Sequence, residues 1–318
     1  MATNAGVPQG SVLSATLFLL HINDVLMPGI YGYADDSTVV ERYQPSPRAS
    51  RDQIQSEREA MVERVNLTLQ AVFDWGDANL VKFNASKTQA CLFTAKRTQL
   101  TLAPSFRNVS LKYTDRLQLL GFEISSNLNF GRFIESKAKA AARKLGVLAK
   151  VRRYFTPGQL LTLYKAQVRS CMEYCCHIWA GAAKCHLAAL DSMERHDKRL
   201  IGDPNLVKTN LISLKYRRKV ASLSVFYRMH FGVCAQELHN LIPPSPFHHR
   251  TTRRSASLHP FVVDLPRIRT KRFATSCIVR TAKEWNKLPA SVFPSDYSVA
   301  VFKARVNKLL LSQCASPS

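Results

Sequence analysis

The stretch IYGYADDSTVV, residues 30–40, decides how the first part of this chain folds. Aromatic and β-branched residues flank a central Ala-Asp-Asp-Ser, which is the pattern of two short strands joined by a tight turn. Neighbouring side chains point to opposite faces of a strand, so Asp35 and Asp36 converge only if the turn re-aims one of them. The two carboxylates could then share a divalent cation, and hard oxygen ligands suit Mg²⁺. An isolated Asp-Asp pair is more commonly a plain solvent-exposed turn, so the surrounding sequence has to decide.

The residues around this stretch predict a mixture of helices and strands. Residues 11–27 are apolar with few interruptions and predict a mostly buried helix. Apolar residues spaced four apart predict an amphipathic helix over about 54–75; they are Met61, Val65, Leu69 and Phe73. Strand-like runs follow at 80–83, 90–93 and 117–124.

Long helices are expected after residue 130. Residues 137–150 are rich in Ala, Lys and Leu, which are strong helix formers. The segment TPGQ, residues 156–159, has the N-cap Thr, N1 Pro and N3 Gln of a helix start, and that helix is expected to run through Cys171. Further helices are expected over 186–200, 211–231 and 299–311, and a Pro-, His- and Arg-rich surface loop or linker over 243–272.

The positive charge is concentrated in the same later part. The net charge is +23, yet residues 1–130 hold 12 basic and 12 acidic residues, whereas residues 131–318 hold 33 and 10. Such a field attracts polyanions, and nucleic acid is the commonest in cells. The alternatives are a basic surface that merely keeps the protein in solution and an acidic protein partner.

Composition and cysteine usage predict a globular intracellular protein, nuclear or cytoplasmic. Apolar residues make up 46% and charged residues 21%, which excludes a wholly disordered chain. No run approaches the roughly 18 apolar residues of a membrane span, so no membrane partner is expected. The first residues lack a signal-peptide pattern, so the eight cysteines are expected to be reduced thiols. The oligomeric state is not readable from the sequence.

Several motifs in a fixed order surround the Asp pair. They are GVPQGSVLS at 6–14, YADD at 33–36, NASKT at 84–88, LLGF at 119–122, SCMEYC at 170–175 and TAKEWNKLP at 281–289. This set resembles reverse transcriptases of non-LTR retrotransposons, particularly the jockey-like elements of insects. The resemblance covers essentially the whole chain.

The resemblance implies an α+β chain with three parts. Residues 1–130 would be a partial polymerase palm, an antiparallel sheet with helices. Residues 131–240 would be an α-helical thumb, and residues 241–318 a basic linker with a C-terminal helical tail. The activity implied is RNA-directed DNA polymerisation, with an RNA template, a DNA primer, dNTPs and Mg²⁺.

The same resemblance assigns site residues. Asp35 would be the principal metal ligand and Asp36 the auxiliary one. Gln9 and Gly10 would border the template and nucleotide, and Lys87 would lie behind the triphosphate. Thumb residues expected to contact the nucleic-acid backbone are Lys137, Lys139, Arg143, Lys144, Lys150, Arg152 and Arg153. A second basic group, expected to bind nucleic acid without specificity, comprises Arg217, Arg218, Lys219, Arg253, Arg254, Arg267, Arg269, Lys271 and Arg272.

The chain also departs from the family pattern. The family's catalytic centre needs a further Asp on a palm strand before the GVPQG loop, and two-metal transfer needs carboxylates on both sides of the ion pair. Asp24 is not expected to replace it, because it lies on the first helix. Ala15 stands where the family usually has Pro, and this change affects no residue expected to bind a ligand. We therefore expect a truncated, catalytically incomplete enzyme with an unpaired sheet edge and uncovered apolar surface. A non-enzymatic nucleic-acid-binding protein is the alternative.

Two residue clusters have a plainer interpretation as well as a functional one. Cys171, Cys175, Cys176 and the Cys185-His186 pair could bind Zn²⁺ if the first two lie one helical turn apart, and His248-His249 invites the same idea. Buried small hydrophobes and a solvated loop are the favoured interpretations. Aromatic residues beside the charges could stack on bases, but core positions are favoured; they are Tyr154, Phe155, Tyr216 and Phe273.

Overall fold

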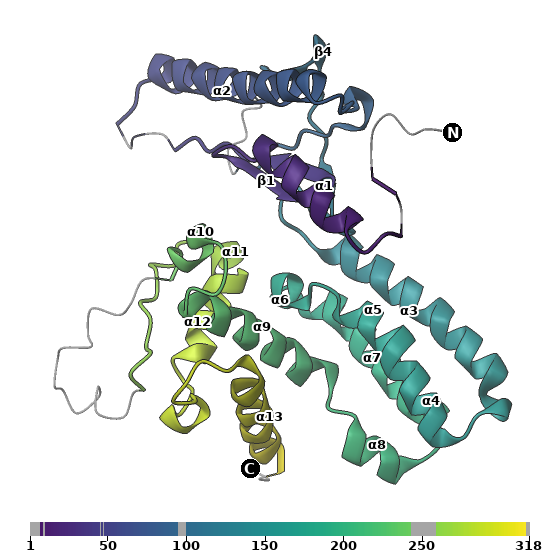
Figure 1. The fold of residues 1–318 in the computed structure, drawn as a ribbon. Helices are drawn as coiled ribbons and strands as arrows, with labels where there is room; N and C mark the ends of the chain where they lie inside the picture. The colour runs from purple at the N-terminus through teal and green to yellow at the C-terminus, as the bar shows by residue number, and fades with distance from the viewer. Residues whose placement is uncertain are drawn as a thin grey trace, which may run out of the picture. The chain divides into compact units, whose positions relative to one another are not determined.

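The computed structural model describes residues 7–8, 10–44, 46, 48–94, 100–242 and 259–315 (Figure 1). The chain divides into two compact units, residues 1–128 and 129–318, which we call unit 1 and unit 2. Helices occur together with short antiparallel strands, so the α+β class is as expected. None of the helices in the described ranges has the length and apolar character needed to cross a bilayer.

Two helices form the scaffold of unit 1. α1 (Ser14–Ile22) continues into the 3-10 turn η1 (Asn23–Val25), and α2 (Arg51–Ala78) starts at a capping box between Ser50 and Gln53. Both helices were predicted. The expectation that α1 is mostly buried is wrong: Leu17 and Leu20 are 52% and 66% exposed. Apolar composition predicts a helix here, but nothing else in the described part of unit 1 covers these side chains.

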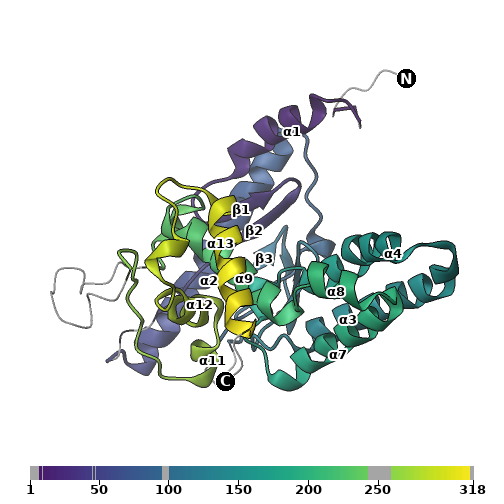
Figure 2. The same ribbon diagram turned by 90° about the horizontal axis from the view of Figure 1, so that it is seen from below.

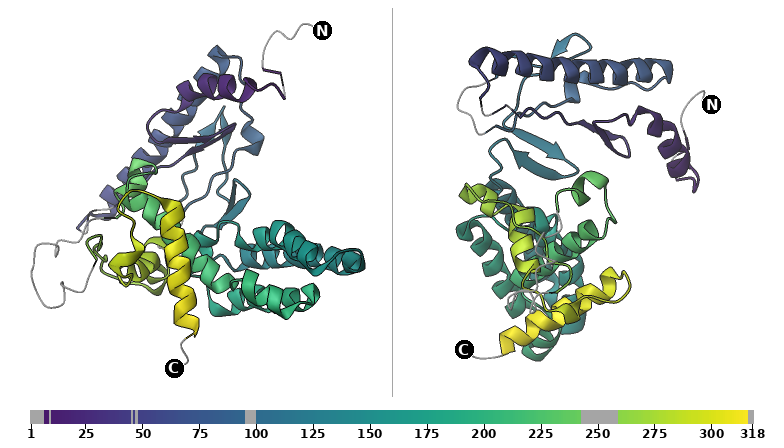
Figure 3. Two further views of the ribbon diagram at one scale, coloured as in Figure 1. Left: turned by 60° about the horizontal axis from the view of Figure 1, so that its bottom comes forward. Right: turned by 90° about the vertical axis from the view of Figure 1, so that its left-hand side faces the viewer.

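The strands in the described part of unit 1 form three separate antiparallel hairpins (Figure 3). The pairs are β1 (Ile30–Tyr33) with β2 (Asp36–Val39), β3 (Ser105–Phe106) with β4 (Val109–Ser110), and β5 (Arg116–Leu119) with β6 (Phe122–Ser125). Each described sheet has two strands, so its outer edges have no strand partner among the described residues.

The hairpin at 30–39 was predicted, but the other strand predictions need correction. The run 117–124 is two strands, because Leu120 and Gly121 adopt positive φ and reverse the chain. Residues 80–83 form no strand; the Val81 N–H instead donates to the Gly76 carbonyl. In the run 90–93 only Ala90 pairs, through an isolated bridge to Tyr113. The β3–β4 hairpin was not predicted.

Unit 2 is helical and begins with a group of packed helices (Figures 1 and 2). α3 (Gly131–Val151) lies against α7 (Lys184–Ile201). In the sequence between these two helices come η3 (Arg152–Tyr154), α4 (Pro157–Leu163), the π-helical η4 (Tyr164–Arg169), α5 (Ser170–Glu173) and α6 (Cys176–Trp179). The helix start at Thr156 is confirmed: its side chain and that of Gln159 form a capping box.

The rest of unit 2, in its described part, contains two longer helices and several shorter elements. The elements are α8 (Pro204–Asn210), α9 (Leu214–His230), α10 (Gln236–His239), α11 (Lys271–Ala274), α12 (Cys277–Trp285), η6 (Ala290–Val292) and α13 (Val299–Ala315). Both α12 and α13 pack on α9. The helices expected over 137–150, 186–200, 211–231 and 299–311 are therefore confirmed, with bounds shifted by a few residues.

An aromatic core joins α9, α12 and α13. Tyr227, Trp285 and Phe302 are fully buried, and the Tyr227 and Phe302 rings stack with centroids 4.3 Å apart. The segment 259–263 contributes to this core, because His259 and Val263 are each 2% exposed. Of the surface loop or linker expected over 243–272, residues 243–258 lie outside the described part of the chain, and a surface position is wrong for His259 and Val263. Local composition marked the segment as irregular but could not show that it packs against α12.

Candidate active-site hairpin and basic surface

The hairpin that carries the Asp pair is buried at its base and exposed at its tip. Ile30 pairs with Val39 at the base, where Ile30 packs with Ile22, Val25 and Val72. Tyr33 pairs with Asp36 at the other end, which leaves Ala34 and Asp35 as the two-residue turn. The apolar base therefore fixes the hairpin beside α2, while both carboxylates face solvent.

The turn brings Asp35 and Asp36 into different backbone settings. Asp35 belongs to the turn and Asp36 opens β2. Ala34 has φ of 53°, a left-handed conformation that few non-glycine residues adopt. The tight turn predicted from the sequence is thus present, and it changes the direction of the chain between the two carboxylates.

A close backbone contact behind the hairpin was not predicted. A Cβ at Gly32 would lie 2.5 Å from Cδ2 of Leu26, so the strand passes directly against the residue after η1. A side chain at residue 32 would displace Leu26 or the strand. The IYGY sequence contained the signal, because an isolated Gly in a strand pattern often marks such an approach.

The hairpin carries side chains of the chemical type that binds Mg²⁺ in proteins. Carboxylate oxygens are hard ligands, and protein-bound Mg²⁺ commonly uses one or two carboxylates together with waters or substrate phosphates. Asp35 and Asp36 supply two such groups. Within the described residues no three His, Cys, Asp or Glu side chains gather to hold a metal ion, and Asp24 in η1 adds no third ligand. The hairpin therefore presents two exposed carboxylates, and the described residues add no third such side chain to form a metal-binding group.

The other predicted nucleotide-binding residues lie on separate segments of unit 1. Gln9 lies outside the described residues; Gly10 precedes α1 with φ of 89°. Lys87 ends the 3-10 turn η2 (Ala85–Lys87) and is exposed. Asn84 caps this turn by accepting from the Ser86 N–H at 2.9 Å. Among the ion pairs of the described chain, none joins Lys87 to Asp35 or Asp36, so the motif builds a turn that presents Lys87 to solvent.

The cations predicted for the thumb lie on α3 and η3, and most are exposed. Arg143, Lys144, Lys150 and Arg152 are exposed and have no ion-pair partner among the described residues. Lys139 pairs with Glu135 at 2.7 Å. Lys137 is half-buried, with its ammonium 4.9 Å from the Phe133 ring centroid and 5.0 Å from that of Tyr174. Among the predicted contact residues, those that are exposed without an ion-pair partner in the described chain thus lie on the second half of α3 and on η3.

The second basic group is corrected by the structure. Arg217 makes a bidentate ion pair with Glu173, Arg218 pairs with Asp191 at 2.9 Å, and Lys219 pairs with Glu284 at 2.5 Å. These cations hold unit 2 together and are not free for phosphates. Their partners lie 27 to 65 residues away in sequence, so the pairing was not readable. Arg267, Arg269, Lys271 and Arg272 are exposed; Arg253 and Arg254 lie outside the described residues.

The cysteine cluster does not have the geometry that a zinc site would need. Cys171 and Cys175 do not share a helix face, because α5 ends at Glu173 and Cys175 adopts φ of 52°. Burial and the nearby Glu173 carboxylate raise the pKa of the Cys176 thiol to about 11, which favours the thiol over the metal-binding thiolate. The favoured interpretation, a buried small hydrophobe, holds for Cys176. His248-His249 lies outside the described residues.

The candidate aromatic residues divide between surface and core. Tyr154 is 68% exposed, Phe155 38% and Phe273 43%, so the core interpretation is wrong for these three. Tyr216 packs against the unit 2 core, as that interpretation predicted.

Comparison with known proteins supports the resemblance seen in the motifs. The chain is 28% identical over 209 residues to a probable RNA-directed DNA polymerase from transposon X-element of Drosophila melanogaster, covering 62% of this chain and 22% of that protein. It is 26% identical over 222 residues to the RNA-directed DNA polymerase from mobile element jockey of the same organism, covering 64% and 23%.

No family model and no solved structure matches the chain. The matched region spans about a fifth of the length of these two relatives. Over about three fifths of its own length, the chain is similar to the reverse transcriptases of jockey-like non-LTR retrotransposons.

Proposed function

We propose that the chain is the palm and thumb portion of an RNA-directed DNA polymerase, with unit 1 as palm, residues 131–240 of unit 2 as thumb and residues 241–318 as a C-terminal extension. The observation that carries this proposal is the YADD hairpin, whose buried base presents two adjacent carboxylates at an exposed turn. The similarity to two mobile-element polymerases supports it. The substrates would be an RNA template, a DNA primer and dNTPs.

In the proposed reaction, a primer 3′-hydroxyl attacks the α-phosphate of a nucleotide in line with the leaving pyrophosphate. Asp35 would be the principal ligand of Mg²⁺ and Asp36 the auxiliary one, and bound Mg²⁺ would offset charge that develops on the phosphate oxygens. Lys87 would pair with the triphosphate, and Gly10 and Gln9 would border the template and nucleotide. Because two-metal transfer needs carboxylates on both sides of the ions, we infer that the chain needs a further carboxylate to complete the site.

The hairpin's role is testable without catalysis. Mn²⁺, used as a paramagnetic probe in place of Mg²⁺, should broaden the amide NMR signals of residues 33–37 selectively. Asp35→Asn should abolish this broadening. Glu63→Gln, which removes an exposed carboxylate on α2, should leave it unchanged. Broadening spread evenly over all exposed carboxylates would contradict the proposed metal role.

Primer extension on an RNA template tests the incompleteness of the site. The 318-residue chain with Mg²⁺ is expected to give no extension, while still binding primer-template. Extension that disappears in Asp35→Ala would show that the chain assembles a full metal site by itself. The inference about a missing carboxylate would then be wrong, and Asp24→Asn would show whether η1 supplies the third ligand.

The second candidate function is nucleic-acid binding without catalysis. It is favoured by the exposed, unpaired cations on α3 and η3 and by the charge imbalance after residue 130. Such binding would fall steeply with salt and ignore both Asp35 and divalent metal. Equal affinity of the parent chain and Asp35→Ala for primer-template is expected under both candidates, whereas metal-dependent signals at the hairpin are expected only under the first.

A further inference from the structure

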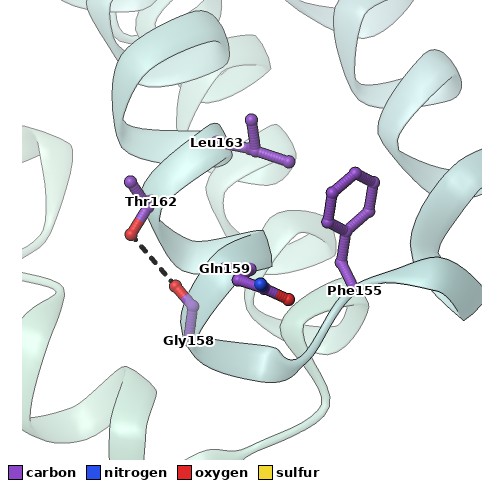
Figure 4. Close-up of a pocket in the computed structure, with 5 residues that line it drawn as sticks. All are labelled: Phe155, Gly158, Gln159, Thr162 and Leu163. Atoms are coloured by element: carbon purple, nitrogen blue, oxygen red, sulfur yellow. Dashed lines mark hydrogen bonds between the residues drawn. The ribbon is translucent and has the colours of Figure 1, made fainter.

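An open hollow lies at the corner of unit 2 where η3 meets α4 (Figure 4). It has a volume of about 310 Å³ and is lined by Phe155, Gly158, Gln159, Thr162 and Leu163. Four of these residues lie on one side of α4, because Gly158 and Thr162 are one helical turn apart and so are the adjacent Gln159 and Leu163. The Phe155 ring approaches from the extended residue before the helix cap, facing the Leu163 side chain (Figure 4).

Local hydrogen bonds fix the walls of this hollow. The Gln159 Oε1 accepts from the Thr156 N–H at 2.9 Å, which holds the Gln159 side chain at the helix start. The Thr162 hydroxyl donates to the Gly158 carbonyl at 3.1 Å, which fixes the orientation of the Thr162 side chain on α4. Apart from the adjoining residues and the backbone of the same helix, no described heavy atom lies within 4 Å of the position that a Gly158 Cβ would take, so the hollow is open beside the glycine.

The stretch of chain that forms the hollow carries charge of one sign. From Ser136 to Met172 the chain carries nine Lys and Arg residues and no Asp or Glu. Lys150, Arg152 and Arg153 are exposed on the approach to Phe155. A polyanion is therefore the complementary partner for this corner.

A second exposed ring stands next to the hollow. Tyr154 is 68% exposed, and Arg153 lies 4.8 Å from its ring centroid while donating to its hydroxyl at 2.7 Å. The guanidinium thus lies over the ring and next to its hydroxyl, which places a cation directly at an exposed aromatic side chain. Exposed aromatic rings among cations are the elements with which proteins bind single-stranded nucleic acid, because any base can stack on them.

We propose that this corner, residues 150–163, is a binding site for single-stranded nucleic acid. One base stacks on Phe155 in the hollow, and the adjoining phosphates pair with Lys150, Arg152 and Arg153. An apolar peptide would fill the hollow but gain nothing from the surrounding charge. The site deepens the nucleic-acid binding proposed above and rests on it, but it does not depend on Asp35 or on metal.

The test separates the base from the phosphate. Affinity of the full chain is measured for a labelled oligothymidine and for an abasic oligomer with the same number of phosphates, at several salt concentrations. Phe155→Ala should weaken oligothymidine binding about tenfold and leave abasic binding and the salt slope unchanged. Arg152→Gln should weaken both ligands alike and reduce the salt slope by about one.

Leu241→Ala is the control, because Leu241 is an exposed apolar side chain of unit 2 outside this corner and carries no ring that could stack. It should change neither affinity. Phe155→Trp should retain base-dependent binding, which excludes a general loss of folding. Equal losses for Phe155→Ala and Leu241→Ala, or an equal loss on the abasic oligomer, would overturn the stacking site. If the parent chain binds neither oligomer, the proposed nucleic-acid function itself fails.

Discussion

The largest buried clusters of unit 1 and unit 2 differ in size. In unit 1 the hairpin that carries Asp35 and Asp36 rests on a small cluster of four buried residues, and α1 leaves leucines exposed. In unit 2 three helices share a core that includes the fully buried Trp285, Tyr227 and Phe302. The Asp pair proposed to bind metal therefore lies on the unit with the smaller buried cluster, and the excess of positive charge lies on the unit with the larger one.

The largest difference is expected for the two tryptophans that anchor these scaffolds. Trp285→Ala should destabilise unit 2 by about 3–5 kcal/mol, because a fully buried indole leaves a cavity. It also removes the 2.7 Å hydrogen bond from its Nε1 to the Phe261 carbonyl. Trp75→Ala in α2 should cost less than half as much, since Trp75 is only half-buried. Denaturant unfolding followed by far-UV circular dichroism measures the free energy of unfolding of both variants. Equal losses of stability would show that the two tryptophans stabilise their units to the same extent.

The next effect concerns ion pairs inside and outside the unit 2 interior. Glu173→Gln should destabilise the unit by about 2 kcal/mol, because Arg217 loses a bidentate partner whose side chain is 18% exposed. Glu135→Gln removes an ion pair of α3 that is exposed on both sides and should give no measurable change. Thermal unfolding of the two variants provides the comparison. A similar loss in both would mean that the pair between α5 and α9 is no better protected than a surface pair.

A smaller effect should appear as a pH dependence confined to unit 2. Burial, and then the charge of Arg280, lower the pKa of His177, so the folded unit binds its proton less readily than the unfolded chain. The resulting stability is fully present above about pH 6.5, the ordinary histidine value, and is lost as pH falls through the folded pKa. His177→Gln should flatten this acid-side loss of stability, measured by denaturant midpoints between pH 7 and 5. An unchanged slope in the variant would assign the loss to other groups.

The smallest change in stability is expected on the uncovered helix of unit 1. Leu17→Glu together with Leu20→Glu should alter the free energy of unfolding by no more than about 0.5 kcal/mol, because both side chains are already exposed. The same double variant should lower concentration-dependent self-association, seen by light scattering, if these leucines drive it. A marked loss of stability would mean that α1 is covered in solution.

Sequence reasoning succeeded where the structure is determined by neighbouring residues. The turn at Ala34-Asp35 and the helix start at Thr156 depend on residues within a few positions, and both were predicted. It failed at Leu120, because nothing but Gly121 marks the reversal that divides residues 117–124 into two strands. It also failed at Cys175, whose left-handed backbone interrupts an otherwise helical stretch.

The remaining errors concern contacts between distant parts of the chain. The pairing of Arg217 with Glu173 spans 44 residues, and only the packing of α9 reveals it. The burial of His259 depends on α12, which lies well beyond any local pattern. At the candidate site, the pattern predicted the Asp-bearing hairpin, but it could not predict the exposed hollow at Phe155, which depends on how η3 turns into α4.

The interlocking of unit 2 has a consequence for dividing the chain. Ile242 and His259 are both buried, so the chain belongs to the core on either side of residues 243–258. The segment after residue 258 is bound to the end of α12, because the Asn286 side chain accepts from the Val263 N–H at 3.0 Å and donates to the Val263 carbonyl at 2.9 Å. A polypeptide ending at residue 242 would hold α9 without α12 and α13, and one beginning at residue 259 would hold the reverse. Co-expressed, the two pieces should behave as a complementing pair, each soluble only when the other supplies the missing half of the same interior.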